Sequence, residues 1–169
     1  MPRRSDDGEI AIVIAELAER MSRGEFTTSL RPETPRFLFH VTQFDNALSA
    51  LRLGKLYSRA EIDRLGAPMI ENASPEIVGS TRPWVKDQVR LYFRPKTATF
   101  YRNEQFRTPG EIWHGAHMPF PVALMFDAAT VLGETGTRFS HGNLASAGHT
   151  VLTSGADALR RLPFHLIYH

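Results

Sequence analysis

The sequence predicts a mixed α+β domain with a mostly antiparallel core. Short runs of β character alternate along the chain with short, irregular helical runs, and no internal repeat interrupts this alternation. The most hydrophobic run, Pro121 to Asp127, is typical of a central strand. A length of 169 residues fits one domain, or one domain with an appendage, and is enough to bury a substantial core.

The first part of the chain begins with an amphipathic helix. Apolar residues recur at helical spacing between Glu9 and Arg23, and Gly24 follows as a stop signal. Two prolines then indicate a connector over residues 24–36. The elements predicted next are a strand at 37–40, a helix at 46–53 ended by Gly54, a short strand at 55–59 and a helical turn at 60–65.

The second part of the chain is less regular. Residues 66–83 are rich in Gly, Pro, Ser and Asn, which predicts a long loop that is either functional or mobile. The further predicted elements are a strand at 89–93, a helical turn at 98–101, a loop at 105–117, the strand at 121–127, a helix at 128–132, a strand edge at 138–143, a helix at 156–162 and an extended stretch at 163–169.

Composition narrows the function class. The chain has no Cys, which excludes disulfides and thiol catalysis and fits a cytoplasmic protein. No run approaches the roughly 18 apolar residues of a membrane span, and no signal-peptide pattern opens the chain. The 20 basic residues include only three Lys, so Arg dominates; this favours contacts to phosphates or carboxylates, or it reflects a GC-rich genome.

One stretch, residues 37–48, combines a strand, a polar turn and a helix start. His40 and Thr42 are two residues apart, so both point to one face of an extended backbone. An imidazole and a hydroxyl on one face are suited to hold a polar ligand. The alternative is that both side chains satisfy local backbone groups.

Arg82 and Trp84 form the second candidate pair. They lie in the irregular segment before the predicted strand at 89–93. Arg82 is suited to clamp a diphosphate and Trp84 to stack on a base. The alternative is a surface Arg beside a Trp that anchors the loop.

Other common site motifs do not support a function. His114 and His117 offer two metal ligands without a clear third one, so we expect no metal site. The chain has neither a Gly-x-Gly-x-x-Gly run after a strand nor a Walker A pattern, and no nucleophile elbow is present.

Four stretches, taken in order, resemble a known family. Leu38-Phe39-His40-Val41-Thr42-Gln43-Phe44-Asp45-Asn46-Ala47-Leu48 and Gly54-Lys55-Leu56-Tyr57-Ser58-Arg59 are the first two. The third runs from Val89-Arg90-Leu91-Tyr92-Phe93-Arg94-Pro95 to Tyr101, and the fourth is Phe139-Ser140-His141-Gly142-Asn143-Leu144-Ala145-Ser146. Together they resemble the opening His-x-Thr stretch, the Ser-Arg continuation, the Tyr-Phe-x-Pro block and the Gly-Asn signature of the DarT-type DNA ADP-ribosyltransferases.

The resemblance implies a fold and a set of site residues. It implies an ADP-ribosyltransferase-like split, mostly antiparallel sheet over residues 35–169, preceded by a helix and connector at 1–34. The implied cofactor-binding residues are His40, Thr42, Asn46, Tyr92 and Phe93, and the implied catalytic residues are Arg82 and His40. The implied substrate-binding residues are Trp84, His141 and Asn143.

The resemblance also implies an activity and partners. The family transfers ADP-ribose from NAD onto a nucleobase of single-stranded DNA, thymine in one branch and guanine in another, and its members are toxins of toxin–antitoxin systems. NAD as substrate, single-stranded DNA and a macrodomain antitoxin are therefore the expected partners. A membrane is not among them.

The catalytic carboxylate departs from the family pattern. The family's Glu lies well downstream of the Gly-Asn signature, whereas the only acidic residue after Gly142 is Asp157. We therefore expect a C-terminally incomplete domain, or a variant that binds NAD and DNA with little or no transfer. The remaining alternatives are a non-catalytic NAD- and nucleic-acid-binding module and a transferase that acts on RNA or protein.

Overall fold

Residues of the helix α1 (Asp6–Ser22) repeat the predicted amphipathic pattern. The computed structural model describes residues 6–96, 108–112, 116–142, 144 and 151–169. The chain divides into two units, which we call the terminal unit (residues 1–39 and 125–169) and the central unit (residues 40–124). Each unit is described by itself. The predicted division at residue 34 stays a prediction.

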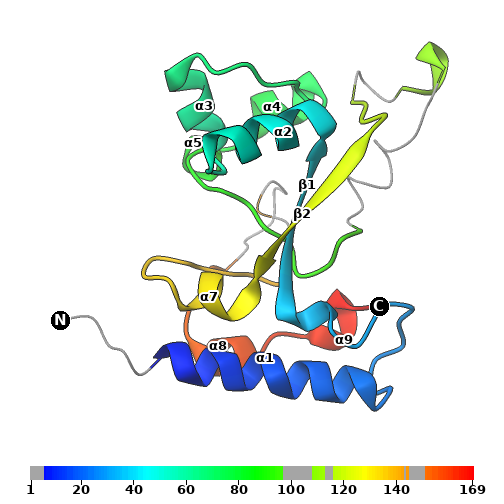
Figure 1. Cartoon of the computed structure of the whole chain (residues 1–169), viewed down its shortest axis with the longest axis vertical. Helices are drawn as coiled ribbons and strands as arrows, with labels where there is room; N and C mark the ends of the chain where they lie inside the picture. The colour runs from blue at the N-terminus through cyan, green and yellow to red at the C-terminus, as the bar shows by residue number, and fades with distance from the viewer. Residues whose placement is uncertain (1–5, 97–107, 113–115, 143, 145–150) are drawn as a thin grey trace. The chain divides into compact units, whose positions relative to one another are not determined.

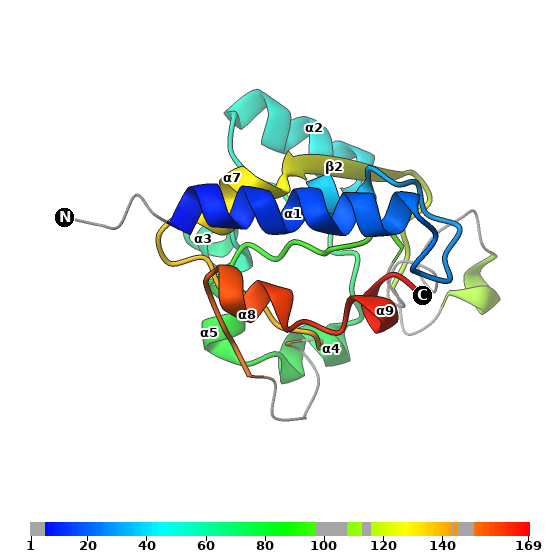
Figure 2. The same cartoon turned by 90° about the horizontal axis from the view of Figure 1, so that it is seen from below.

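The core of the terminal unit is built on α1. The side chains at helical spacing, Ile10, Val13, Leu17 and Met21 among them, are buried, and the predicted helix at 9–23 is confirmed. It packs on the 3₁₀ turn η1 (Thr34–Arg36), α7 (Ala128–Gly133) and α8 (Ala156–Arg160); Figure 2 shows α1 and α8 side by side. The helices predicted at 128–132 and 156–162 are thereby confirmed.

The end of the chain is helical, where an extended stretch was predicted. The prediction for 163–169 is wrong because Pro163 precedes a short helix, α9 (Phe164–Ile167). The rings of Phe164 and Tyr168 stack at 5.4 Å, and Phe26 meets Tyr168 edge-on at 5.8 Å. A four-residue helix is too short to leave a periodic pattern, and aromatic packing stabilises it instead.

Two antiparallel strands form the sheet of the described residues, which confirms the α+β class. They are β1 (Phe37–Gln43) and β2 (Pro121–Asp127), and both were predicted. The unit boundary falls within each strand. A further antiparallel bridge joins Phe139 to Thr153, where the sequence predicted a strand edge.

The helices of the central unit are short and capped by local sequence signals. They are α2 (Phe44–Leu53), α3 (Arg59–Leu65), α4 (Pro75–Ser80) and α5 (Pro83–Lys86), drawn together in Figure 1. Gly54 adopts a left-handed conformation (φ 64°) after α2, as the stop signal requires. The Ser58 hydroxyl accepts a hydrogen bond from the Glu61 N–H at the start of α3.

Three predictions in the central unit are wrong. Residues 66–83 are not a continuous loop, because Ser74 and Pro75 begin α4 and Arg82 and Pro83 begin α5. The strands predicted at 55–59 and 89–93 are not formed. Their apolar residues contribute to the wall of a cavity instead. The turn predicted at 98–101 lies outside the described residues, and the predicted loop at 105–117 contains the 3₁₀ turn η2 (Pro109–Glu111).

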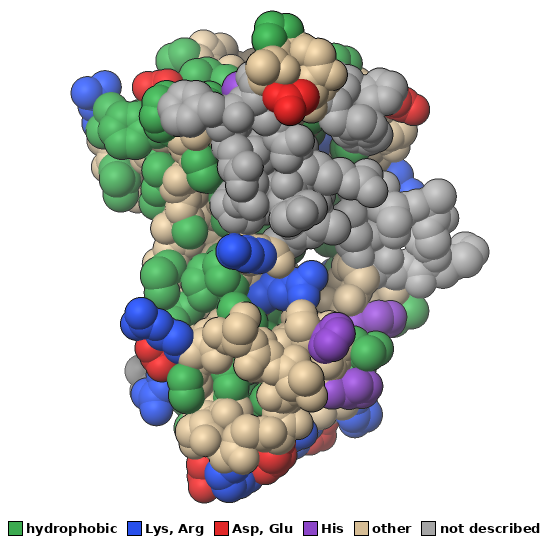
Figure 3. Space-filling view, turned by 90° about the vertical axis from the view of Figure 1, so that its right-hand side faces the viewer, with side chains coloured by type: hydrophobic (Ala, Val, Ile, Leu, Met, Phe, Trp, Pro, Cys, Tyr) green, Lys and Arg blue, Asp and Glu red, His purple; other side chains and the backbone are tan. Residues whose placement is uncertain are grey.

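Several large hydrophobic side chains stay exposed, and Figure 3 shows hydrophobic side chains (green) at the surface of one face. In the central unit they include Phe44, Leu51, Leu53, Leu65 and Ile70. Within the part of the chain that the structure describes, no helix combines the length and the apolar character of a membrane span.

Candidate functional site

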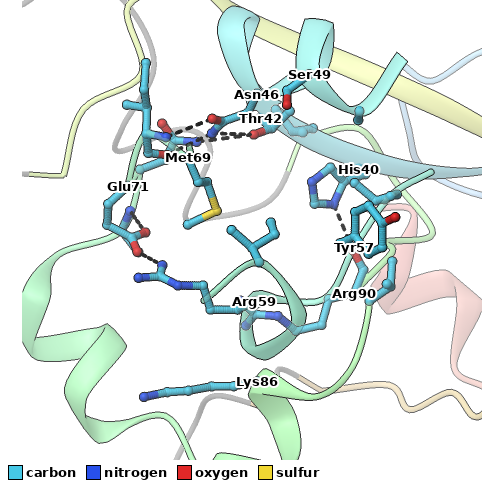
Figure 4. A pocket seen from close by; sticks show the side chains of 18 of the residues that line it. His40, Thr42, Asn46, Ser49, Tyr57, Arg59, Met69, Glu71, Lys86 and Arg90 are labelled. Carbon is cyan, nitrogen blue, oxygen red and sulfur yellow. Dashed lines mark hydrogen bonds and ion pairs between the residues drawn. The ribbon is translucent and has the colours of Figure 1, made fainter. Parts of the chain in front are cut away.

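A cavity of about 250 Å³ lies in the central unit. His40, Val41 and Thr42 of β1 all line it. Figure 4 shows His40, Tyr57 and Arg90 on one side, Met69 and Glu71 on the other. The cavity is somewhat below the roughly 300 Å³ at which pockets for drug-sized ligands begin, so it suits a nucleoside-sized group.

His40 is held in one tautomer. Its Nδ1 lies 3.1 Å from the carbonyl oxygen of Arg90. Because a carbonyl only accepts, Nδ1 carries the hydrogen and Nε2 keeps a free lone pair. Burial lowers the pKa of His40 below its ordinary value of 6.5, the positive charge of Arg90 lowers it further, and the Arg90 carbonyl opposes both. His40 is therefore a neutral imidazole at pH 7 that can accept a hydrogen bond.

Asn46 fixes the loop that forms another wall. Its Nδ2 donates to the Ile70 carbonyl and its Oδ1 accepts from the Ile70 N–H, each at 2.8 Å. The amide thus pairs with a peptide unit as a neighbouring strand would. These contacts make Asn46 a support of the cavity wall.

Thr42 sits between two amides. Nδ2 of Asn46 and Nδ2 of Asn72 each lie 3.3 Å from its Oγ1 and donate to it. The side chain is buried, with 6% of its surface exposed. Because both oxygen lone pairs are engaged, the hydroxyl hydrogen remains as a donor.

Arg59 and Glu71 form an ion pair across the cavity (Figure 4). Asp63 holds the same guanidinium, with Nε to Oδ1 at 3.0 Å. The other oxygen of Glu71 accepts from the Ala73 N–H at 3.0 Å. Among the described residues that line the cavity, Glu71 is the only carboxylate, and its charge is compensated.

The remaining cations of the wall have no such partner. Lys55, Lys86 and Arg90 line the cavity, and none of them forms an ion pair with any residue that the structure describes. Tyr57 and Tyr92 line the same cavity and offer ring surfaces. Unpaired cations beside aromatic rings are suited to bind a phosphate-bearing nucleotide.

The other predicted site residues do not line this cavity. Arg82 precedes α5 and is exposed, and Trp84 is 39% exposed on the same helical turn. Phe93 is half-buried beyond the lining residue Tyr92. His141 is exposed in the terminal unit, and Asn143 lies outside the described residues. No three potential metal ligands cluster within the described ranges.

Comparison with known proteins gives the family. The model of a family described as "ssDNA thymidine ADP-ribosyltransferase, DarT" matches residues 39–169. The chain belongs to the DarT family. None of the curated proteins and none of the solved structures searched matches it. The match begins beside His40 and covers every residue that lines the cavity.

The DarT family is a family of ADP-ribosyltransferases whose description names single-stranded DNA as the substrate. His40, Thr42, Asn46 and Tyr92, which the resemblance implied as cofactor-binding residues, all line the cavity. Lys86, Glu71 and Asn72 line it as well and carry no motif. Tyr57, Arg59 and Arg90 lie inside stretches that resemble the family, so the family pattern was the available signal for them.

Proposed function

We propose that the protein transfers ADP-ribose from NAD onto a thymine base of single-stranded DNA. The single observation that carries this proposal is the cavity of a DarT family member in which a neutral His, a Thr hydroxyl and three unpaired cations converge. A sugar, an amide and a phosphate are the groups that these side chains recognise.

The proposed roles follow from the chemistry of each side chain. Nε2 of His40 accepts a hydrogen bond from a ribose hydroxyl, and the Thr42 hydroxyl donates to an amide oxygen. Lys55 and Arg90 neutralise the phosphate charge of NAD. Nicotinamide leaves with the electron pair of its bond to the ribose, so positive charge develops on the ribose. A lone pair of the base forms the new bond to the ribose, and the proton of the base passes to water.

Two measurements on the same preparation test this function. We expect calorimetric titration to show NAD binding that is at least tenfold weaker in His40→Ala, because a ligand hydroxyl loses its acceptor. We also expect mass spectrometry to detect an ADP-ribose adduct on a single-stranded oligonucleotide that contains thymine. An adduct only on oligonucleotides whose reactive base is guanine would change the assigned base.

Glu71 favours a second candidate, a module that binds NAD and DNA without transfer. Transfer needs a carboxylate to stabilise the ribose cation, and the only one among the described lining residues is tied to Arg59 and the Ala73 N–H. NAD binding without any adduct on DNA would favour this candidate.

We further propose that the protein acts as a toxin in a toxin–antitoxin or phage-defence system, with a macrodomain partner that removes the adduct. A bulky group on a template base blocks base pairing, so the producing cell needs a reversing activity. Expression of the wild-type chain should slow growth, and His40→Ala should relieve the effect. Equal toxicity of both chains would contradict this role.

A further inference from the structure

Residues 82–96, which we call the basic segment, are the most positively charged part of the central unit. The segment contains five cationic side chains and one carboxylate, so it carries a net charge of +4 against +2 for the whole chain. It begins at Arg82, makes the single helical turn α5, and continues to Lys96 without a further helix or strand. The charge is therefore concentrated on one short, continuous stretch.

Four of the five cations of the basic segment differ in their pairing from several cations elsewhere in the described chain. Arg20, Arg23, Arg59 and Arg64 are all engaged with carboxylates on their own or adjoining elements. By contrast, the structure describes no ion pair for four cations of the basic segment, Arg82, Lys86, Arg90 and Lys96. Of these four, Lys86 is half-buried and the other three are exposed.

An aromatic ring lies among these charges. Trp84 is 39% exposed and lies between Arg82 and Lys86 on the turn of α5. An exposed indole flanked by unpaired cations matches what a flexible single strand offers, namely unstacked bases along a charged backbone. A duplex presents stacked bases instead, so it fits this arrangement less well.

The basic segment also leads into the cavity. Lys86, Val89, Arg90 and Tyr92 belong to it and line the cavity, whereas Arg82 and Trp84 lie on the turn just before them. We propose that the basic segment is the track for the single-stranded DNA. Arg82, Lys86 and Lys96 contact the DNA phosphates, Trp84 stacks on a base next to the target, and the target base reaches the cavity. This inference rests on the proposed function and adds the surface that binds the substrate.

The test is fluorescence anisotropy of a labelled single-stranded oligonucleotide with the full chain over a range of salt concentrations. Neutralising one contacting cation, in Arg82→Gln or Lys86→Gln, should reduce the slope of log affinity against log salt by about 0.7. Trp84→Ala should weaken binding at least about fivefold at every salt concentration with an unchanged slope. Arg52→Gln, an exposed Arg on α2, is the matched control and should change neither quantity.

Each outcome decides the question. Wild-type slopes and affinities in all three segment variants, or an equal loss in Arg52→Gln, would overturn the track. Unmeasurable binding of the oligonucleotide to the wild-type chain would overturn it as well. Oligonucleotide binding that depends on Arg82, Lys86 and Trp84, together with no NAD binding by the wild-type chain, would support the track and contradict the transferase function. NAD binding and DNA modification by the wild-type chain, together with DNA binding that is unchanged in the Arg82, Lys86 and Trp84 variants, would support the transferase function and contradict the track.

Discussion

His40 shows how one backbone contact can set the chemistry of a side chain. The Arg90 carbonyl accepts a hydrogen bond from Nδ1–H, so Nε2, the nitrogen that remains for a ligand, is a hydrogen-bond acceptor. A protonated ring would turn that acceptor into a donor. The site therefore depends on His40 remaining neutral, which burial favours.

We expect acid to destabilise the wild-type chain more than His40→Gln. The pKa of His40 is lower in the folded state, so the unfolded chain binds more protons as the pH falls through about 6.5. The contribution of His40 to the free energy of unfolding is therefore present above that pH and is lost as the pH falls below it. Urea unfolding at pH values from 7.5 to 5.5 measures the difference, with the exposed His165→Gln as control. Parallel pH profiles for wild type and His40→Gln would contradict the expectation.

Tyr168 differs from His40 because its polar group is buried in an apolar environment. The side chain is fully buried, burial raises the pKa of its hydroxyl, and that hydroxyl has no hydrogen-bond partner among the described residues. A buried polar group without a partner destabilises the fold.

Tyr168→Phe should therefore raise the free energy of unfolding by about 1 kcal/mol, because it removes the hydroxyl and keeps the ring. Tyr168→Ala should lower it by about 3–5 kcal/mol, because the contacts with Phe26 and Phe164 are lost. Chemical denaturation measures both. Destabilisation by Tyr168→Phe would show that the hydroxyl has a stabilising partner.

At the scale of elements, the loop at 66–73 owes its position to side chains of its neighbours. Asn46 on α2 binds the Ile70 peptide unit, and Arg59 on α3 binds Glu71. The loop has no ladder of backbone hydrogen bonds of its own to define its path. The conformation of the loop is therefore determined by side chains of α2 and α3, and the shape of the cavity depends on that conformation.

Asn46→Ala should lower the free energy of unfolding by about 1–3 kcal/mol, because both Ile70 bonds are lost. Hydrogen exchange of the Ile70 amide should speed up, and NAD binding should weaken with it. Ser49→Ala, which changes another α2 residue of the cavity wall, is the matched control. Unchanged exchange at Ile70 would contradict the role assigned to Asn46.

Element prediction succeeded where local signals are strong. The periodicity of α1, the apolar run of β2 and the glycine after α2 are each readable without tertiary context. Prediction failed for α4, α5 and α9, which are four to six residues long, although α7 and α8, of six and five residues, were predicted. Helices of that length depend on caps and packing, and packing partners are distant in the sequence.

At the scale of the whole molecule, the terminal unit joins segments from both ends of the chain. α1 packs on α7 and α8, which follow it by more than 100 residues. The apolar face of α1 was predictable, but its partners were not, because periodicity reports a buried face without naming what covers it. The same limit applies to the cavity: His40 and Thr42 were predictable as neighbours, whereas Lys86 and Glu71 meet them only in the folded chain.

Leu17→Ala should lower the free energy of unfolding by about 2–5 kcal/mol, because Leu17 is 3% exposed within this packing. Ile12→Ala on the same helix is the matched control, since Ile12 is 54% exposed, and its effect should stay within about 0.5 kcal/mol. Hydrogen exchange should report faster opening of α8 together with α1 in Leu17→Ala. Loss of protection in α1 alone would contradict their shared core.

The pairing of Asn46 with the Ile70 peptide unit has a consequence for sequence variation. Asn46 hydrogen-bonds to the backbone N–H and carbonyl of Ile70, while the Ile70 side chain is 46% exposed. The fold should therefore tolerate almost any amino acid at position 70 in a saturation library, with proline excluded because it lacks the N–H. At position 46 it should tolerate almost no other amino acid. Because Ile70 also lines the cavity, the loop can vary the side chain that it presents to the site while the backbone that shapes the cavity stays in place.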